Sequence, residues 1–258
     1  MLLAHPGRVV EASARVYRRT WRGSVISTFF NPILYLLAMG VGLGKLVDEG
    51  AGTTSLDLPY LTFLAPGLLA ATAMMTGAGD ASWPVMAGIK WRKTYEAVLA
   101  TPVGVGDLVI GHLSWVGVRL VFVTVVYSGV MTAFGATTVA EGLLSIPPAV
   151  LTGLGFAAVI TAYTARLKDE QGLAALFRFA VMPLFLFSGT FFPLDQLPAW
   201  AQPVAAATPL YHGVSLCRGL ALGTGFEVHP AVSVAYLVAM VTLGTILAIR
   251  LMARRLVT

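Results

Sequence analysis

Residues 231–251, AVSVAYLVAMVTLGTILAIRL, form the cleanest apolar stretch of the chain, with no charged side chain before Arg250. A helix needs about 20 mostly apolar residues to cross the hydrocarbon core of a bilayer. Five further stretches meet this requirement, at residues 25–44, 58–79, 108–134, 143–165 and 172–193. The sequence therefore predicts an all-α polytopic membrane protein with six transmembrane helices.

The overall composition points the same way. Of the 258 residues, 57% are hydrophobic and 11% are charged, whereas a soluble domain carries about 25% charged residues. This composition excludes a soluble enzyme, a disordered regulator and a secreted disulfide scaffold. The single cysteine, Cys217, excludes an intramolecular disulfide and a cysteine-based metal cluster. We expect it to be a small buried hydrophobe.

The distribution of basic residues predicts the orientation. If the N-terminus is cytoplasmic, thirteen of the seventeen Lys and Arg residues fall on the cytoplasmic side, namely Arg8, Arg15, Arg18, Arg19, Arg22, Lys90, Arg92, Lys93, Arg166, Lys168, Arg250, Arg254 and Arg255. The outer loops instead carry Asp48, Glu49, Asp57, Glu141, Asp195 and Glu227, with only Lys45 and Arg218 beside them. The positive-inside rule then places both termini in the cytoplasm. The net charge of +5 is explained by the membrane, and no nucleic acid is needed.

Residues 1–24 predict a cytoplasmic amphipathic helix and contain no apolar core of a cleavable signal. At 100° per residue one face collects the arginines, which are Arg8, Arg15, Arg18, Arg19 and Arg22. Tyr17 and Trp21 fall on the opposite face, so such a helix would lie in the headgroup region. The alternative is a basic flank that only orients the first span. Asn31-Pro32 predicts a kink early in that span.

The cytoplasmic loop at residues 80–106 contains good helix formers from residue 89 to residue 100, and Thr101-Pro102 ends this pattern. We expect a short helix there, with the side chains of Lys90, Arg92, Lys93, Tyr95 and Glu96 exposed to the cytosol. This helix could dock into a groove of a partner protein. It could equally be an interfacial tether between two spans.

The outer loop at residues 193–229 is long but apolar, and four prolines divide it into pieces that are too short to cross a membrane. Such pieces are typical of short broken helices whose backbone is buried in protein. They would form either an exit gate or a packed outer cap.

Two charged residues, Arg119 and Arg178, fall inside predicted spans, where charge is costly unless it is paired or hydrated. Arg178 is close enough to the cytoplasmic end to snorkel to the headgroups. For Arg119 we favour an ion pair with a carboxylate of a neighbouring helix over contact with a substrate. The sequence contains no phosphate-binding loop, no HExxH and no spacing of His, Cys, Asp or Glu that suggests a metal. We therefore predict no catalytic residue and no metal ligand.

Several local strings resemble the ABC-2 type exporter permeases. Residues 90–102, KWRKTYEAVLATP, look like the segment between spans two and three of that family. Residues 187–194, FSGTFFPL, with LPAW at 197–200 and TPL at 208–210, look like its signature around span five and the outer loop. The whole layout is similar to the branch that exports nodulation factors and daunorubicin-type drugs.

This resemblance implies one transmembrane permease domain over residues 1–258, in a bacterial inner membrane. Within it, residues 1–24 are the interfacial helix, 25–251 the membrane domain and 252–258 the cytoplasmic tail. Residues 89–100 become a coupling helix that docks on a separate ABC ATPase subunit, which binds ATP and Mg²⁺. The implied contact residues are Lys90, Trp91, Arg92, Lys93, Thr94, Tyr95 and Glu96. This chain would bind no cofactor. The outer gate would include Phe191, Phe192, Leu197, Trp200, Leu210 and Tyr211.

The resemblance also implies a homodimer of permeases that exports an amphipathic, drug-like, lipid-linked or glycan-linked molecule. The alternative is an ion-coupled secondary transporter or a channel that acts without an ATPase. A proton-coupled carrier should have carboxylates in the middle of its spans, and the predicted spans contain none.

Overall fold

The computed structural model describes residues 5–49, 58–223 and 225–257, and every regular element in these ranges is helical. Residues 1–4, Asp57 and residue 258, which carry predictions about the chain ends and the first outer loop, lie outside these ranges. Five described helices are long and apolar enough to cross a membrane, namely Thr28–Glu49, Tyr60–Trp91, Val105–Ala133, Val139–Arg166 and Pro230–Leu256. The predicted all-α membrane fold is confirmed.

The first span belongs to a helical run made of α1 (Pro6–Tyr35), the π-helical segment η1 (Leu36–Leu43) and α2 (Gly44–Glu49). The remaining elements are α3 (Tyr60–Met86), η2 (Ala87–Trp91), α4 (Thr94–Leu99), α5 (Val105–Ala133), α6 (Val139–Leu144), α7 (Ile146–Arg166), α8 (Gln171–Leu176), η3 (Phe177–Val181), α9 (Met182–Phe187), η4 (Leu194–Gln196), α10 (Gln202–Ala206), α11 (Pro209–Leu222) and α12 (Pro230–Leu256). The short elements η4, α10 and α11 are the broken helices predicted for the last outer loop.

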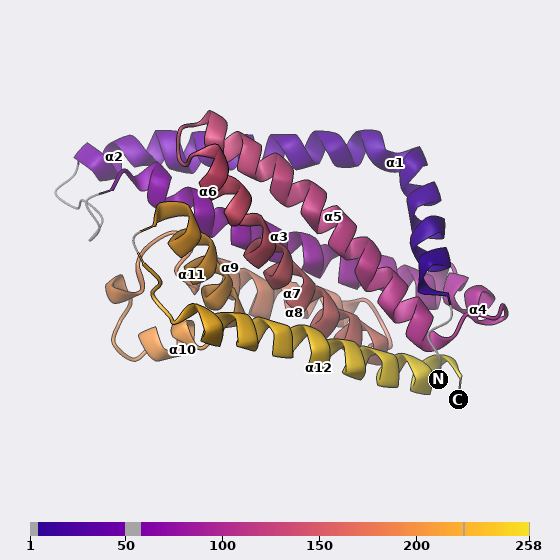
Figure 1. Ribbon diagram of the computed structural model, residues 1–258. Helices are drawn as coiled ribbons and strands as arrows, with labels where there is room; N and C mark the ends of the chain where they lie inside the picture. Colours follow the sequence, from indigo (N-terminus) through magenta and orange to yellow (C-terminus); the bar gives the residue numbers. More distant parts are fainter. Residues whose placement is uncertain (1–4, 50–57, 224, 258) are drawn as a thin grey trace.

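Different segments of the chain lie at the two ends of the molecule. Figure 1 shows both termini and α4 at one end of the bundle, and α2 and α10 at the other. The N-terminal part of α1 runs across the direction of the long helices, as a helix in the membrane plane would. The predicted interfacial helix and the start of the first span belong to one continuous helix, because α1 changes direction without a helix end. The predicted tail at residues 252–258 is helical as far as Leu256.

The fifth predicted span, 172–193, is shorter in the structure. Helices α8 and α9 and the π-helical η3 form one run, Gln171–Phe187, which at 1.5 Å per residue is about 26 Å long. This length is near the lower limit for crossing a bilayer. The run ends because Ser188 leaves the helical region and Gly189 has a φ of +74°. Glycine adopts this left-handed backbone without a steric penalty.

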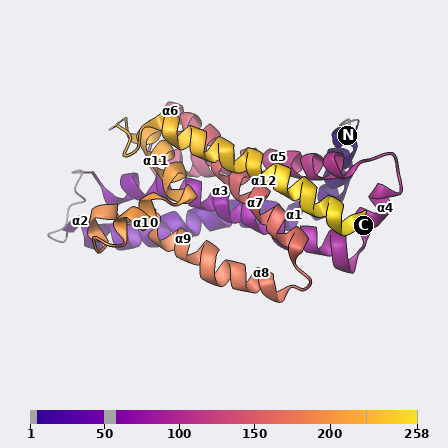
Figure 2. The ribbon, with the colours of Figure 1, turned by 90° about the horizontal axis from the view of Figure 1, so that it is seen from below.

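Small residues allow the central helices to approach closely. Helix α7 packs against both α3 and α12, and Figure 2 shows the bundle from the side on which α12 crosses it. A Cβ atom placed on Gly77 of α3 would lie 2.2 Å from the main-chain oxygen of Gly153 in α7. On the other side of α7, a Cβ atom on Gly244 would lie 2.9 Å from the Cβ of Ala158. Close backbone contact of this kind is a main source of helix association in membranes.

We expect Gly77→Ala to lower the melting temperature of the purified protein, because the new methyl group collides with a main-chain atom that cannot rotate away. Overpacking of this kind costs about 1–3 kcal/mol. Differential scanning fluorimetry in detergent measures the shift. Gly79→Ala in the same helix is the matched control, since a Cβ atom there meets nothing within 4 Å. Equal melting temperatures for the two variants would contradict the close contact between α3 and α7.

Candidate functional site

The predicted coupling segment is built from the end of α3. The helix continues past Met86 through the π-helical turn η2 and stops where the Arg92 N–H donates to the Ala87 carbonyl, at 2.8 Å. Lys93 then has a left-handed backbone, with φ of 50°, and α4 starts at Thr94. The prediction of one separate helix over 89–100 is therefore wrong. The segment consists of the tip of the second span, a sharp turn and a helix of six residues.

Packing divides the side chains of this segment into two sets. The ring of Tyr95 covers Gly88, where a Cβ atom would lie 2.6 Å from the ring, so Tyr95 is half-buried rather than exposed as predicted. Burial raises the pKa of the Tyr95 hydroxyl. The other predicted side chains are exposed, namely Lys90, Trp91, Arg92, Lys93, Thr94 and Glu96. Tyr95 is thus the anchor of the turn, and the exposed residues form its outer surface.

One ion pair and one set of hydrogen bonds join other elements to this end of the bundle. Lys90 lies 3.5 Å from the carboxylate of Glu170, in the turn between α7 and α8. The pKa of Glu170 is lowered by its own backbone N–H and by Lys90. Arg255 of α12 donates to the carbonyl oxygens of Thr164, Ala165 and Leu167 at 3.2, 2.9 and 2.6 Å, which caps the C-terminus of α7. The predicted coupling segment therefore lies beside a part of the bundle in which contacts join η2, α7 and α12.

The apolar side of the N-terminal part of α1 packs on the start of α5. The backbone N–H of His5 donates to the carboxylate of Asp107 at 3.1 Å, and Val9 fills the space above Gly111. The Tyr17 ring meets Trp115 with 5.6 Å between ring centroids. The predicted lipid-facing residues are exposed, namely Arg8, Arg15, Arg18, Arg19, Trp21 and Arg22. This arrangement leaves the basic face free for lipid headgroups or a partner.

The two predicted intramembrane arginines have different surroundings. Arg119, the middle residue of α5, forms an ion pair with Asp80 of α3, and its guanidinium lies 5.8 Å from the Tyr17 ring centroid. The favoured prediction of a neighbouring carboxylate is confirmed. Asp80 itself was assigned to the loop at 80–106, which is wrong because α3 continues beyond it. Arg178 lies in η3 with its side chain exposed.

The predicted gate residues do not form one surface. Phe191 packs against Phe185, with 5.3 Å between ring centroids, and its carbonyl accepts a hydrogen bond from the Tyr60 hydroxyl. Leu210 and Tyr211 are buried in α11. Phe192 and Leu197 are half-buried, whereas Trp200 is 77% exposed. Part of this segment is therefore a packed cap, and the exposed part lies around Trp200.

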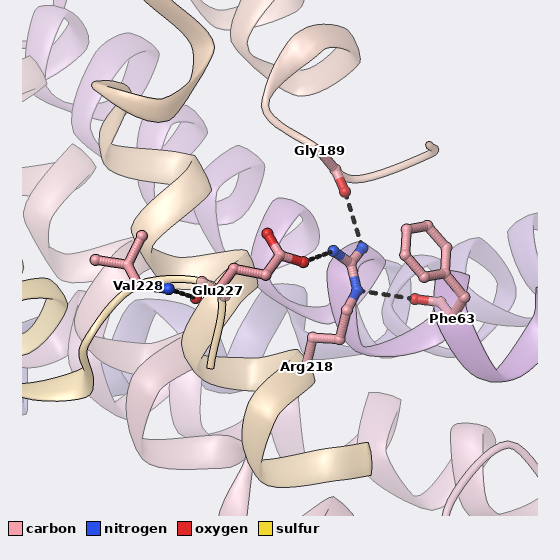
Figure 3. A network of polar contacts seen from close by, with 6 residues as sticks. Phe63, Gly189, Arg218, Glu227 and Val228 are labelled. Carbon is pink, nitrogen blue, oxygen red and sulfur yellow. Dashed lines mark hydrogen bonds and ion pairs between the residues drawn. The ribbon is translucent and has the colours of Figure 1, made fainter. Parts of the chain in front are cut away.

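Sequence reasoning missed the residue that holds this cap together. Arg218 of α11 is 3% exposed, and Figure 3 shows its guanidinium between three elements of the chain. It donates to the carboxylate of Glu227 at 3.0 Å, to the Gly189 carbonyl at 2.8 Å and to the Phe63 carbonyl at 3.3 Å. It also lies 3.8 Å from the Phe63 ring centroid. The available signal was one arginine in an otherwise apolar segment, nine residues before Glu227.

Within the described ranges, no three His, Cys, Asp or Glu side chains are close enough to share a metal ion. The arrangement can instead present a basic, partly aromatic surface at one end. At the other end, buried hydrogen bonds from Arg218 hold the bend at Gly189. A long helix, Tyr60–Trp91, connects the two ends.

Comparison with known proteins gives a family. The family model described as ABC-2 type transporter matches residues 8–222. Nodulation protein J of Rhizobium meliloti strain 1021 is 28% identical over 240 residues, which cover 93% of this chain and 89% of that protein. Nodulation protein J of Rhizobium leguminosarum bv. trifolii is 29% identical and covers 84% of this chain and 79% of its own length. The inner membrane transport permease YadH of Escherichia coli K12 is 21% identical over 77% of this chain and 75% of its own length. The chain belongs to the ABC-2 type transporter family.

Proposed function

We propose that this chain is the transmembrane permease subunit of an ATP-driven exporter, and that a separate ABC ATPase subunit docks on residues 90–96. The observation that carries the proposal is the exposed basic turn at the tip of the second span, anchored by Tyr95 on Gly88. The absence of a phosphate-binding loop from the sequence agrees with ATP and Mg²⁺ binding on the partner subunit. Family membership supports the transport role.

The long helix suggests how a push at one end would reach the other. Tyr60–Trp91 has 32 residues and is about 48 Å long. Near its outer end, the Tyr60 hydroxyl donates to the Phe191 carbonyl at 3.1 Å, and the Phe63 carbonyl accepts from Arg218. Movement of the turn at Lys93 would therefore act directly on the bend after α9. In this proposal, closure of the ATPase pair shifts the helix and rearranges the outer cap.

The assembly and its location follow from the same proposal. We place both termini in the cytoplasm of a bacterial cell, with the basic face of α1 on anionic lipid of the inner membrane. Two permease copies would surround the export path, and the cargo would be an amphipathic, drug-like, lipid-linked or glycan-linked molecule. The relative YadH carries the name of an inner membrane transport permease, which supports this placement.

An ion-coupled carrier is the second candidate, because α3 places the carboxylate of Asp80 inside a span. The ion pair with Arg119 argues against it, since this carboxylate is already engaged by a side chain of the neighbouring helix α5. Transport by the chain in vesicles without any ATPase would support the carrier.

The double charge reversal Arg92→Glu/Lys93→Glu should weaken binding of the ATPase subunit and remove its stimulation by the permease. Reversed charge in an interface costs several kcal/mol, so we expect a loss of about tenfold or more in affinity. Lys168→Glu, an exposed charge reversal at the same end, is the matched control. Normal stimulation in the double variant would show that the turn only tethers two spans.

Labelling with a membrane-impermeant maleimide tests the orientation. The native Cys217 is buried, so the wild-type chain should stay unlabelled. Trp200→Cys should be labelled in spheroplasts with an intact inner membrane, and Lys168→Cys only after permeabilisation, because these residues are exposed at opposite ends. The reverse pattern would place both termini outside.

A further inference from the structure

Asp107 is a buried carboxylate in the first turn of α5. It is 2% exposed, and none of the ion pairs among the described residues includes it. Burial of a carboxylate is costly unless hydrogen bonds satisfy its oxygens. The hydrogen bonds to these two oxygens therefore show which parts of the chain Asp107 holds.

Each carboxylate oxygen of Asp107 accepts a hydrogen bond from a different part of the main chain. Oδ2 accepts from the Gly104 N–H at 3.1 Å, which caps α5 and fixes the loop that leaves α4. Oδ1 accepts from the N–H of His5, the residue directly before α1, at 3.1 Å. The cap of α5 needs only the first of these bonds. The second bond joins the start of α1 to the loop after α4.

The packing beside Asp107 seats α1 on α5. One turn further along α5, a Cβ atom on Gly111 would lie 2.6 Å from the Cβ of Val9. One more turn along, Trp115 meets the Tyr17 ring edge to face, with 5.6 Å between ring centroids. The N-terminal part of α1 therefore lies along the first turns of α5, and Asp107 fixes the first residue of this contact.

The same end of the bundle carries the docking turn, residues 90–96, and the exposed arginines of α1 (Figure 1). Five residues, 100–104, separate the end of α4 from the start of α5. The position of α1 relative to the turn thus depends on this loop and on the contact between α1 and α5. Asp107 is bonded to both the loop and the start of α1.

We propose that Asp107 is a positioning residue of the ATPase docking surface. Its carboxylate fixes the start of α1 against the loop after α4, so that the basic face of α1 keeps a constant place beside the docking turn. The inference rests on the proposed docking of an ATPase subunit and goes beyond it by naming the side chain that sets the geometry of the surface. Asparagine cannot replace Asp107, because its amide has one acceptor oxygen and its NH₂ group would face an N–H donor.

The first measurement is the distance between α1 and α4 in the full-length chain, in lipid nanodiscs and without an ATPase subunit. Spin labels on Val16→Cys and Ala97→Cys, both at exposed positions, report this distance by double electron–electron resonance. The native Cys217 is buried and should stay unlabelled. We expect one narrow distance distribution for the parent chain, and a displaced or broader distribution for Asp107→Asn.

A second variant and two matched controls locate the effect. Gly111→Ala should displace α1 without touching the carboxylate, because its methyl group would lie 2.7 Å from the Pro6 carbonyl oxygen. Its control is Gly129→Ala in the same helix, where a Cβ atom meets nothing within 4 Å. The control for Asp107→Asn is Glu141→Gln, since Glu141 caps α6 in the same way, away from α4. Melting temperatures identify a variant that fails to fold, and the other variant then decides the outcome.

The second measurement is the stimulation of the ATPase subunit as its concentration is raised. Asp107→Asn should raise the half-saturating concentration about three- to tenfold, the value of one or two lost hydrogen bonds. The maximum stimulated rate should stay unchanged, because the residues of the docking turn are intact. A residue that only stabilises the fold would do the opposite, since a loss of folded protein lowers the maximum rate and leaves the half-saturating concentration unchanged.

Three results would overturn the role of Asp107. They are the parent distance distribution in both Asp107→Asn and Gly111→Ala, an equal change in Glu141→Gln, and an unchanged half-saturating concentration when α1 is displaced. The distance measurement needs no ATPase subunit. Failure of the contact between α1 and the loop is therefore distinguishable from failure of the proposed docking.

Discussion

The ion pair between Arg119 and Asp80 is the interaction on which the membrane part of the structure depends. Arg119 is the middle residue of α5, so its side chain is too short to carry the charge to either end of the helix. An uncompensated charge at such a depth costs at least about 3 kcal/mol. Pairing offsets part of this cost and ties α5 to α3. The Tyr17 ring on the other side of Arg119 brings α1 into the same cluster.

Helix α3 and its extension η2 run from one end of the molecule to the other, and Asp80 of this cluster lies on α3. At one end, Gly88 supports Tyr95 and so fixes the direction of the exposed turn. At the other end, Tyr60 and Phe63 are bonded to the bend after α9, directly and through Arg218. The same helix lacks a side chain at Gly77, which lets α7 press against its backbone. The proposed docking turn and the cap around Arg218 are thus connected by one helix.

The lengths of the apolar stretches were sufficient to predict the helical membrane fold, because each depends on many residues at once. The positions at which the helices end were not predictable in the same way. Lys93 and Gly189 each change the course of the chain through one left-handed backbone conformation, a choice made by packing around a single residue. Asp80 was placed in a loop because the predicted apolar stretch ends at residue 79. Its partner is 39 residues away on another helix, and no local pattern reveals that pairing.

A double-mutant cycle on the ion pair tests the central claim most directly. Melting temperature and folded yield in detergent are compared for the wild-type chain, Asp80→Asn, Arg119→Gln and the double variant. If each charge is stabilised by the other, Asp80→Asn alone should be strongly destabilised, because it leaves Arg119 uncompensated, and the double variant should recover most of the loss. A wild-type melting temperature for Asp80→Asn, or a double variant that loses the sum of both single effects, would contradict the account.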